Sequence, residues 1–73
     1  MTKEAFLKNL GNNIARLRKE AGLSQVELAV RCGKDKQSIN RIEKGGHNPS
    51  AYILQEIASV LKVPVKEFFE FGE

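Results

Sequence analysis

The stretch Lys36–Lys44 concentrates side chains that can form hydrogen bonds with base edges and with phosphates. At about 100° per residue, a helix over this stretch places Ile39 and Ile42 on one side. The polar residues that fall on the opposite side are Gln37, Asn40, Arg41 and Lys44, with Lys36 at its leading edge. Gln and Asn can bond bidentately to adenine, Arg and Lys can reach guanine, and all of them can bind phosphate.

The charge of this stretch has one sign on its outer face. Five cations and two anions lie between Arg31 and Lys44, and no carboxylate falls among the outward residues. A solvated helix usually mixes both signs, because oppositely charged residues at i and i+4 stabilise each other. A plain solvated face is the alternative, but the pattern favours a surface that reads DNA.

No other set of residues along the chain suggests catalysis, metal binding or cofactor binding. There is no Ser/His/Asp or Cys/His set, no pair of carboxylates at an evident cleft, and no Gly-rich phosphate loop after a strand, so we do not expect an enzyme. We also expect no metal site and no cofactor. The single His47 lies in a turn and suits solvent or a DNA phosphate, and the single Cys32 suits the core better than redox sensing.

The polar stretch needs a framework, and apolar spacing predicts one made of helices only. A first helix, about residues 4–21, carries an apolar stripe of Phe6, Leu10, Ile14, Leu17 and Ala21. Further helices are expected at about 36–44, 51–61 and 65–71. No window alternates with period two, so no strand is expected.

A helix-turn-helix unit is predicted over about residues 24–44. Ser24 and Glu27 form a capping-box sequence that begins its first helix, with Leu28, Ala29 and Cys32 inward. Gly33 ends that helix, and Asp35 is a good N-cap for the next one. In such a unit the second helix can enter the major groove.

Size and hydropathy define the class of protein. The 73 residues form one domain, predicted over 1–73, with a net charge of +3. No apolar stretch approaches the roughly 20 residues of a membrane span, and the N-terminus lacks the pattern of a signal peptide. We therefore expect a cytoplasmic protein without a membrane partner.

Near-continuous motifs resemble the Cro/phage-repressor (xenobiotic-response-element) helix-turn-helix family. They comprise IARLRKEAGLSQVELA at 14–29, Gly33, SI at 38–39, RIEKG at 41–45 and NPS at 48–50. The resemblance implies an all-α, five-helix, lambda-repressor-like DNA-binding domain whose third helix reads the major groove. Repressors, restriction-modification controllers and antitoxins of this family are commonly dimers on pseudo-palindromic operators.

Matching residue by residue implies roles for the polar side chains. The residues expected to read bases are Lys36, Gln37, Asn40 and Arg41, the last of which matches a position nearer the flanking backbone. The residues expected to bind phosphate are Gln25, Ser38 and Lys44. Arg18 and Glu43 match a buried ion pair that ties helix 1 to helix 3. Two departures, Lys62 in place of Gly and Pro64 in place of a Ser or Thr cap, concern the start of the last helix.

The C-terminal residues predict a homodimer. A short terminal helix can turn only part of its surface to its own core, so some of its aromatic rings are expected at a two-fold interface. The predicted interface residues are Val65, Phe68, Phe69 and Phe71. The alternative is that Phe68 and Phe69 complete the monomer core while Phe71 frays.

Together these features predict a sequence-specific transcriptional regulator, a repressor or a restriction-modification controller, that binds double-stranded DNA as a homodimer. An antitoxin that also binds a toxin is the first alternative. The second is a protein-interaction module that does not read DNA, which the carboxylate-free face of residues 36–44 disfavours.

Overall fold

In the computed structural model, which describes residues 1–72, four α-helices and one 3₁₀-helix pack around a single core. The helices are α1 (Lys3–Glu20), α2 (Gln25–Arg31), α3 (Lys36–Glu43), α4 (Ala51–Leu61) and the 3₁₀-helix η1 (Val65–Phe69). No strand occurs among the described residues, so the all-α prediction is confirmed. Residue 73, the last of the predicted domain, lies outside the described residues.

Local capping explains where the four α-helices begin. The hydroxyls of Thr2, Ser24 and Ser50 each accept a backbone N–H three residues on, and Asp35 Oδ1 does the same for Ser38 at 2.7 Å. At α2 the bond is reciprocal, because Glu27 Oε1 accepts the Ser24 N–H at 2.8 Å. The helix starts therefore follow from short-range chemistry that the sequence displays.

The predicted fifth α-helix is wrong in type and length. The segment forms a 3₁₀-helix of five residues, in which the Glu67 N–H donates to the Pro64 carbonyl at 3.1 Å. Pro64 precedes it as a cap that makes no side-chain hydrogen bond. Lys62, one of the two departures from the family pattern named above, adopts the left-handed conformation at φ 59° and ψ 42° and ends α4. Both departures thus lie where the chain turns sharply into a short, tight helix.

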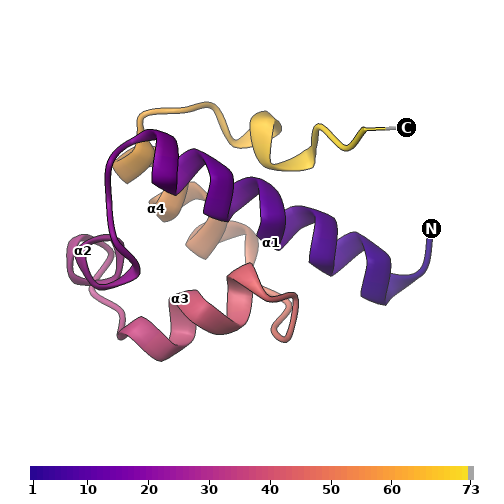
Figure 1. Ribbon diagram of the computed structural model, residues 1–73, viewed down its shortest axis with the longest axis horizontal. Coiled ribbons are helices and arrows are strands. Elements are labelled where there is room, and N and C mark those ends of the chain that lie inside the picture. The colour runs from indigo at the N-terminus through magenta and orange to yellow at the C-terminus, as the bar shows by residue number, and fades with distance from the viewer. Residues whose placement is uncertain (73) are drawn as a thin grey trace.

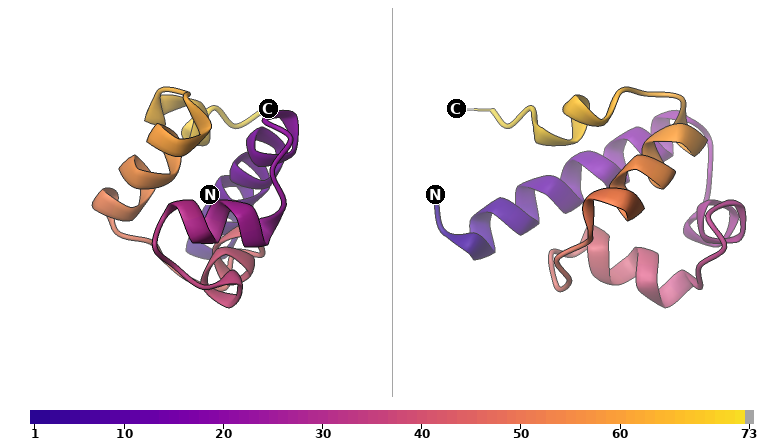
Figure 2. Two further views of the ribbon diagram at one scale, coloured as in Figure 1. Left: turned by 90° about the vertical axis from the view of Figure 1, so that its left-hand side faces the viewer. Right: turned by 180° about the vertical axis from the view of Figure 1, so that it is seen from behind.

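Helix α1 lies between α3 and the C-terminal segment. Figure 1 shows α3 below it and the C-terminal segment above it, with α4 behind; Figure 2 shows the same order from the other side. The side chains at the centre of the core are Ile14, Leu28, Ile39, Ile57 and Phe68, all fully buried. The inward residues predicted for α2 are confirmed, since Leu28, Ala29 and Cys32 are buried.

The predicted α1 stripe needs two corrections at its ends. Phe6 is 38% exposed, whereas its neighbour Leu7 is buried, and Ala21 is an exposed C-cap. The ring of Phe6 packs instead beside the rings of Phe69 and Phe71 in the C-terminal segment. The middle of the stripe, from Leu10 to Leu17, lies inside as expected.

Candidate nucleic-acid interface

Helix α3 has one apolar face and one polar face. Ile39 and Ile42 are buried against the core. The exposed residues are Lys36, Gln37, Arg41 and Lys44, and Asn40 is half-buried at the edge of the same face. Because eight residues make only about two turns, the outer face presents these side chains within a short span of roughly 12 Å.

Positive charge on this face exceeds the negative charge of an exposed acid beside it, Asp35, whose carboxylate interacts electrostatically with Arg41. Asp35 caps α3, and the backbone N–H of Ser38 holds the pKa of its carboxyl below the usual value. Glu43 is buried and turned toward α1. The cations Lys36, Arg41 and Lys44 therefore dominate the outward surface of α3, as an interface with phosphates requires.

An unusually close approach between α1 and α3 sets the position of the polar face. A Cβ at Gly11 would lie 2.7 Å from the carbonyl carbon of Glu43, and closer still to the carbonyl oxygens of Ile42 and Glu43. Just beyond α3, Gly45 has φ 79°, and a Cβ there would lie 3.0 Å from the backbone N and Cα of Lys8. The two helices can approach this closely only because Gly11 has no side chain.

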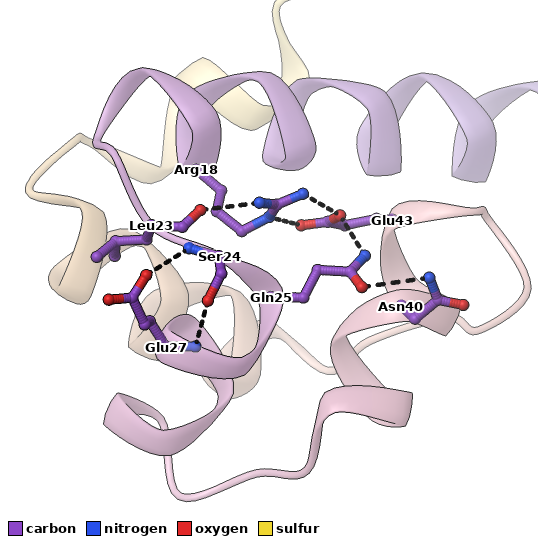
Figure 3. Close-up of polar contacts among 7 residues, drawn as sticks. All are labelled: Arg18, Leu23, Ser24, Gln25, Glu27, Asn40 and Glu43. Carbon is purple, nitrogen blue, oxygen red and sulfur yellow. Dashed lines mark hydrogen bonds and ion pairs between the residues drawn. The ribbon is translucent and has the colours of Figure 1, made fainter.

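A buried ion pair joins the same two helices. Arg18 Nε donates to Glu43 Oε2 at 2.6 Å and Arg18 Nη2 donates to Glu43 Oε1 at 3.0 Å. Arg18 Nη1 also donates to the Leu23 carbonyl at 2.8 Å, ahead of α2. The pair expected from the resemblance is therefore present in the structure, and it links α1, α3 and the start of α2 (Figure 3).

Gln25, at the start of α2, is engaged inside the protein. Its Nε2 donates to Glu43 Oε1 at 2.9 Å, and its Oε1 accepts from Asn40 Nδ2 at 3.5 Å. Figure 3 shows the amide of Gln25 between these two side chains. Its phosphate contact stays a prediction, and the structure adds a second role that the sequence did not suggest.

Ser38 lines a basic hollow between α3 and α4. The hollow has a volume of about 250 Å³ and is lined by Lys34, Ser38, Arg41, Ile42, His47 and Ile53. Lys34 Nζ also lies 3.8 Å from Glu56 Oε1 on α4. Three of its six lining side chains carry or can accept positive charge, which suits an anion such as a phosphate at the flank of α3.

The predicted interface residues at the C-terminus divide into two groups. Phe68 is fully buried in the core of its own chain, so its assignment to a dimer interface is wrong. Its position is fixed by Asn13 Nδ2, which donates to the Phe68 carbonyl at 3.0 Å and to the Glu70 carbonyl at 3.2 Å. Val65 is half-buried against the core, while Phe69 is 40% exposed.

Phe69 belongs to a cluster that we call the aromatic patch, formed by Phe6, Phe69 and Phe71. The ring centroids of Phe6 lie 6.0 Å from Phe69 and 5.4 Å from Phe71, the latter pair edge to face. The segments that carry these rings are the start of α1 and the C-terminal segment, which runs on the side of α1 away from α3, and both termini emerge at the same end of the molecule (Figure 1). Sequence reasoning missed Phe6 because its spacing also fits the apolar stripe of α1.

Three further features concern metal ions, membranes and the single thiol. Among residues 1–72 no group of three or more His, Cys, Asp or Glu side chains could hold a metal ion. Over the same residues no helix has both the length and the apolar character needed to cross a membrane. Burial raises the pKa of the Cys32 thiol, which keeps it protonated and unreactive.

Comparisons with known proteins identify relatives of this architecture. Residues 14–68 match the helix-turn-helix family model HTH_3. The HTH-type transcriptional regulator y4dJ of Sinorhizobium fredii is 43% identical over 56 residues, covering 77% of this chain and 73% of that protein. The HTH-type transcriptional regulator SlrR of Bacillus subtilis is 37% identical over 62 residues; the chain spans 41% of its length, and the match covers 84% of this chain.

Solved structures agree with these matches. The restriction-modification controller protein C.AhdI from Aeromonas hydrophila superposes with a TM-score of 0.86 at 32% identity. That match covers 89% of this chain and 98% of the controller protein. The likeness therefore extends over most of this chain and nearly all of the controller protein.

Proposed function

The chain belongs to the HTH_3 helix-turn-helix family of DNA-binding transcriptional regulators, and we propose that it binds a pseudo-palindromic operator sequence-specifically as a homodimer. The observation that carries the proposal is the exposed, carboxylate-free outer face of α3. The regulator is of the repressor or restriction-modification controller kind, a choice supported by its likeness to C.AhdI over nearly all of that protein.

We assign one set of side chains to base reading and a second set to phosphate binding. The base-reading residues are Lys36, Gln37, Asn40 and Arg41, whose amides and cations match base edges in the major groove. The phosphate-binding residues are Gln25, Ser38 and Lys44, which lie at the borders of that face. Ser38 and Arg41 also border the basic hollow, whose lining supports the proposal that a flanking phosphate binds near His47.

The aromatic patch supports the second copy. Its rings are about 40% exposed at Phe6 and Phe69, and exposed aromatic surface is stabilised when a two-fold partner covers it. A single α3 reads only a few base pairs, whereas two copies about 34–36 Å apart read both halves of a palindrome on one face of the duplex.

Selection from random DNA duplexes tests the DNA-binding proposal. The expected result is enrichment of an inverted repeat by the wild-type protein. Gln37→Ala should relax the preference at one position of each half-site, at a cost of about 1–3 kcal/mol. Gln55→Ala, on the exposed side of α4, is the matched control and should leave the selected sequence unchanged. Recovery of no sequence, or of an unchanged sequence after Gln37→Ala, contradicts the proposal.

Sedimentation at micromolar concentration tests the dimer. Wild type should have twice the single-chain mass, and Phe69→Glu should give single chains, because a carboxylate in the aromatic patch would be desolvated at the interface. Val30→Glu is the control, since Val30 is 72% exposed on α2, away from the patch. A single-chain species in wild type rules the dimer out and leaves the patch for another protein, as an antitoxin would require.

A further inference from the structure

Lys8 of α1 fills the open side of Gly45, the residue that follows the C-cap of α3. A Cβ at Gly45 would lie 3.1 Å from Lys8 Cγ, nearly as close as to the Lys8 backbone. The aliphatic stem of Lys8 therefore runs beside the glycine, which leaves room for it only because it has no side chain. Lys8 is nevertheless exposed, because a lysine keeps its ammonium in water while its stem packs.

Helical spacing places Lys8 on the face of α1 that meets α3. Lys8 lies within about 80° of both Gly11 and Arg18 around the helix. Gly11 meets the last carbonyls of α3, and Arg18 binds Glu43. Because Lys8 meets Gly45 instead, it lies beyond the C-terminal end of α3. Figure 1 shows this part of α1 beside the loop that follows α3.

The end of α3 thus carries two cations without an acidic partner. Lys44, the C-cap of α3, is exposed like Lys8. Among residues 1–72 neither of them lies within 4.0 Å of a carboxylate, since the ion pairs there involve Arg16, Arg18 and Lys34. Cations near the last carbonyls of a helix also stabilise the helix itself, so a role in stability is the alternative to a role in binding.

An α3 inserted into the major groove would bring this end of the helix to the DNA backbone. In helix-turn-helix proteins the N-terminal residues of the second helix contact base edges. Eight residues make a helix about 12 Å long, and the major groove is about 12 Å wide. Cations just beyond the last residue of α3 therefore face the phosphates that border the groove.

We propose that Lys8 binds an operator phosphate at the C-terminal end of α3, next to the phosphate assigned to Lys44. The proposal rests on the function proposed above, because it requires α3 to lie in the major groove. It adds α1 to the elements that contact DNA. A phosphate contact carries no sequence preference, so Lys8 raises the affinity for all duplexes and leaves the selected sequence unchanged.

The first experiment measures how operator affinity depends on salt. Lys8→Met keeps most of the stem and removes the charge, and it should reduce the slope of log affinity against log salt by about one for each copy bound. Lys8→Arg keeps the charge and should keep the slope of wild type. Lys62→Met is the matched control, because Lys62 is an exposed lysine at the end of α4 away from that loop.

The second experiment locates the phosphate. Uncharged methylphosphonate linkages are placed one at a time along the operator selected by wild type. At one linkage in each half-site the substitution should weaken binding of wild type about 2- to 10-fold, the range for one hydrogen bond. The same linkage should have no further effect on Lys8→Met, because the two changes remove one contact. If every linkage weakens both proteins equally, Lys8 holds no phosphate.

The outcomes separate the two proposals. If wild type binds its operator and Lys8→Met keeps the salt slope of Lys62→Met, the Lys8 contact is wrong while operator binding stands. A lower Tm with an unchanged slope assigns Lys8 to the stability of α3 and also overturns the contact. If wild type selects no sequence, operator binding itself fails. Should Lys8→Met prove unfolded by circular dichroism, Lys8→Gln, which is polar and uncharged, takes its place in both experiments.

Discussion

Replacing Gly11 with Ala puts two known effects in opposition. Gly11 lies in the middle of α1, where Ala is the better helix former by about 1 kcal/mol. On propensity alone, Gly11→Ala should stabilise the protein. Its Cβ, however, would meet the last backbone carbonyls of α3 rather than a flexible side chain.

The geometry indicates that the overlap is the larger effect. Carbon atoms pack at about 3.5–4.0 Å, and the added carbon would lie 2.7 Å from the Glu43 carbonyl carbon, so α3 must move by about 1 Å. Overpacking of this kind costs about 1–3 kcal/mol, and a backbone obstacle belongs near the upper end. Subtracting the propensity gain leaves a net loss of about 2 kcal/mol, or roughly 8–16 °C in Tm for a domain of this size.

Thermal unfolding followed by circular dichroism measures this effect. Asn12→Ala is the matched control, because Asn12 is the next residue of α1 and is exposed, so Ala there should leave Tm unchanged or raise it. The reasoning is refuted if Gly11→Ala melts at or above the temperature of wild type. A second measurement, operator affinity, should fall for Gly11→Ala, because the displaced α3 no longer meets the groove at the same depth.

Three more substitutions probe separate features. Arg18→Met leaves the buried Glu43 carboxylate without its cation and should cost about 3–5 kcal/mol in denaturant unfolding, whereas Lys3→Met on the surface should cost little; equal losses contradict the role of the pair. Asp35→Asn keeps a good N-cap but removes a carboxyl whose pKa is lowered in the folded state. The stabilisation from a lowered pKa is present above the pKa of the unfolded state and is lost as pH falls. The Tm of wild type should therefore fall further than the Tm of Asp35→Asn between about pH 5 and pH 3. An equal fall in both proteins would contradict this role of the Asp35 carboxylate. Lys44→Ala should weaken binding to all duplexes alike and reduce the slope of log affinity against log salt by about one, and an unchanged slope would remove Lys44 from the phosphate contacts.

The sequence predicted the four α-helices well because their boundaries depend on neighbouring residues. Ser24 with Glu27, and Asp35 with the Ser38 N–H, form caps within one turn, which spacing alone reveals. The last helix was harder, because Pro64 and the left-handed Lys62 determine its type, and the Phe residues fit either an α-helix or a 3₁₀-helix.

The candidate site was predictable in part. The polar face of α3 follows from helical period, which orders side chains around one axis. The contact between Gln25 and Asn40 depends instead on how two helices cross, and the role of Gly11 depends on a third helix. Burial of Phe68 beside exposed Phe69 likewise depends on where Asn13 holds the C-terminal carbonyls.

If two copies meet at the aromatic patch, α1 of each copy fixes the distance between that interface and the α3 helix that would contact the operator. One of its faces holds α3 through Gly11 and Arg18, and a face roughly 140° away carries Phe6 and Asn13. A continuous helix of 18 residues, about 27 Å long, does not stretch or hinge. The distance between the two α3 helices is then set by one rigid α1 helix in each copy. Operators with one base pair inserted or removed between the half-sites should therefore bind one copy tightly and the second copy weakly.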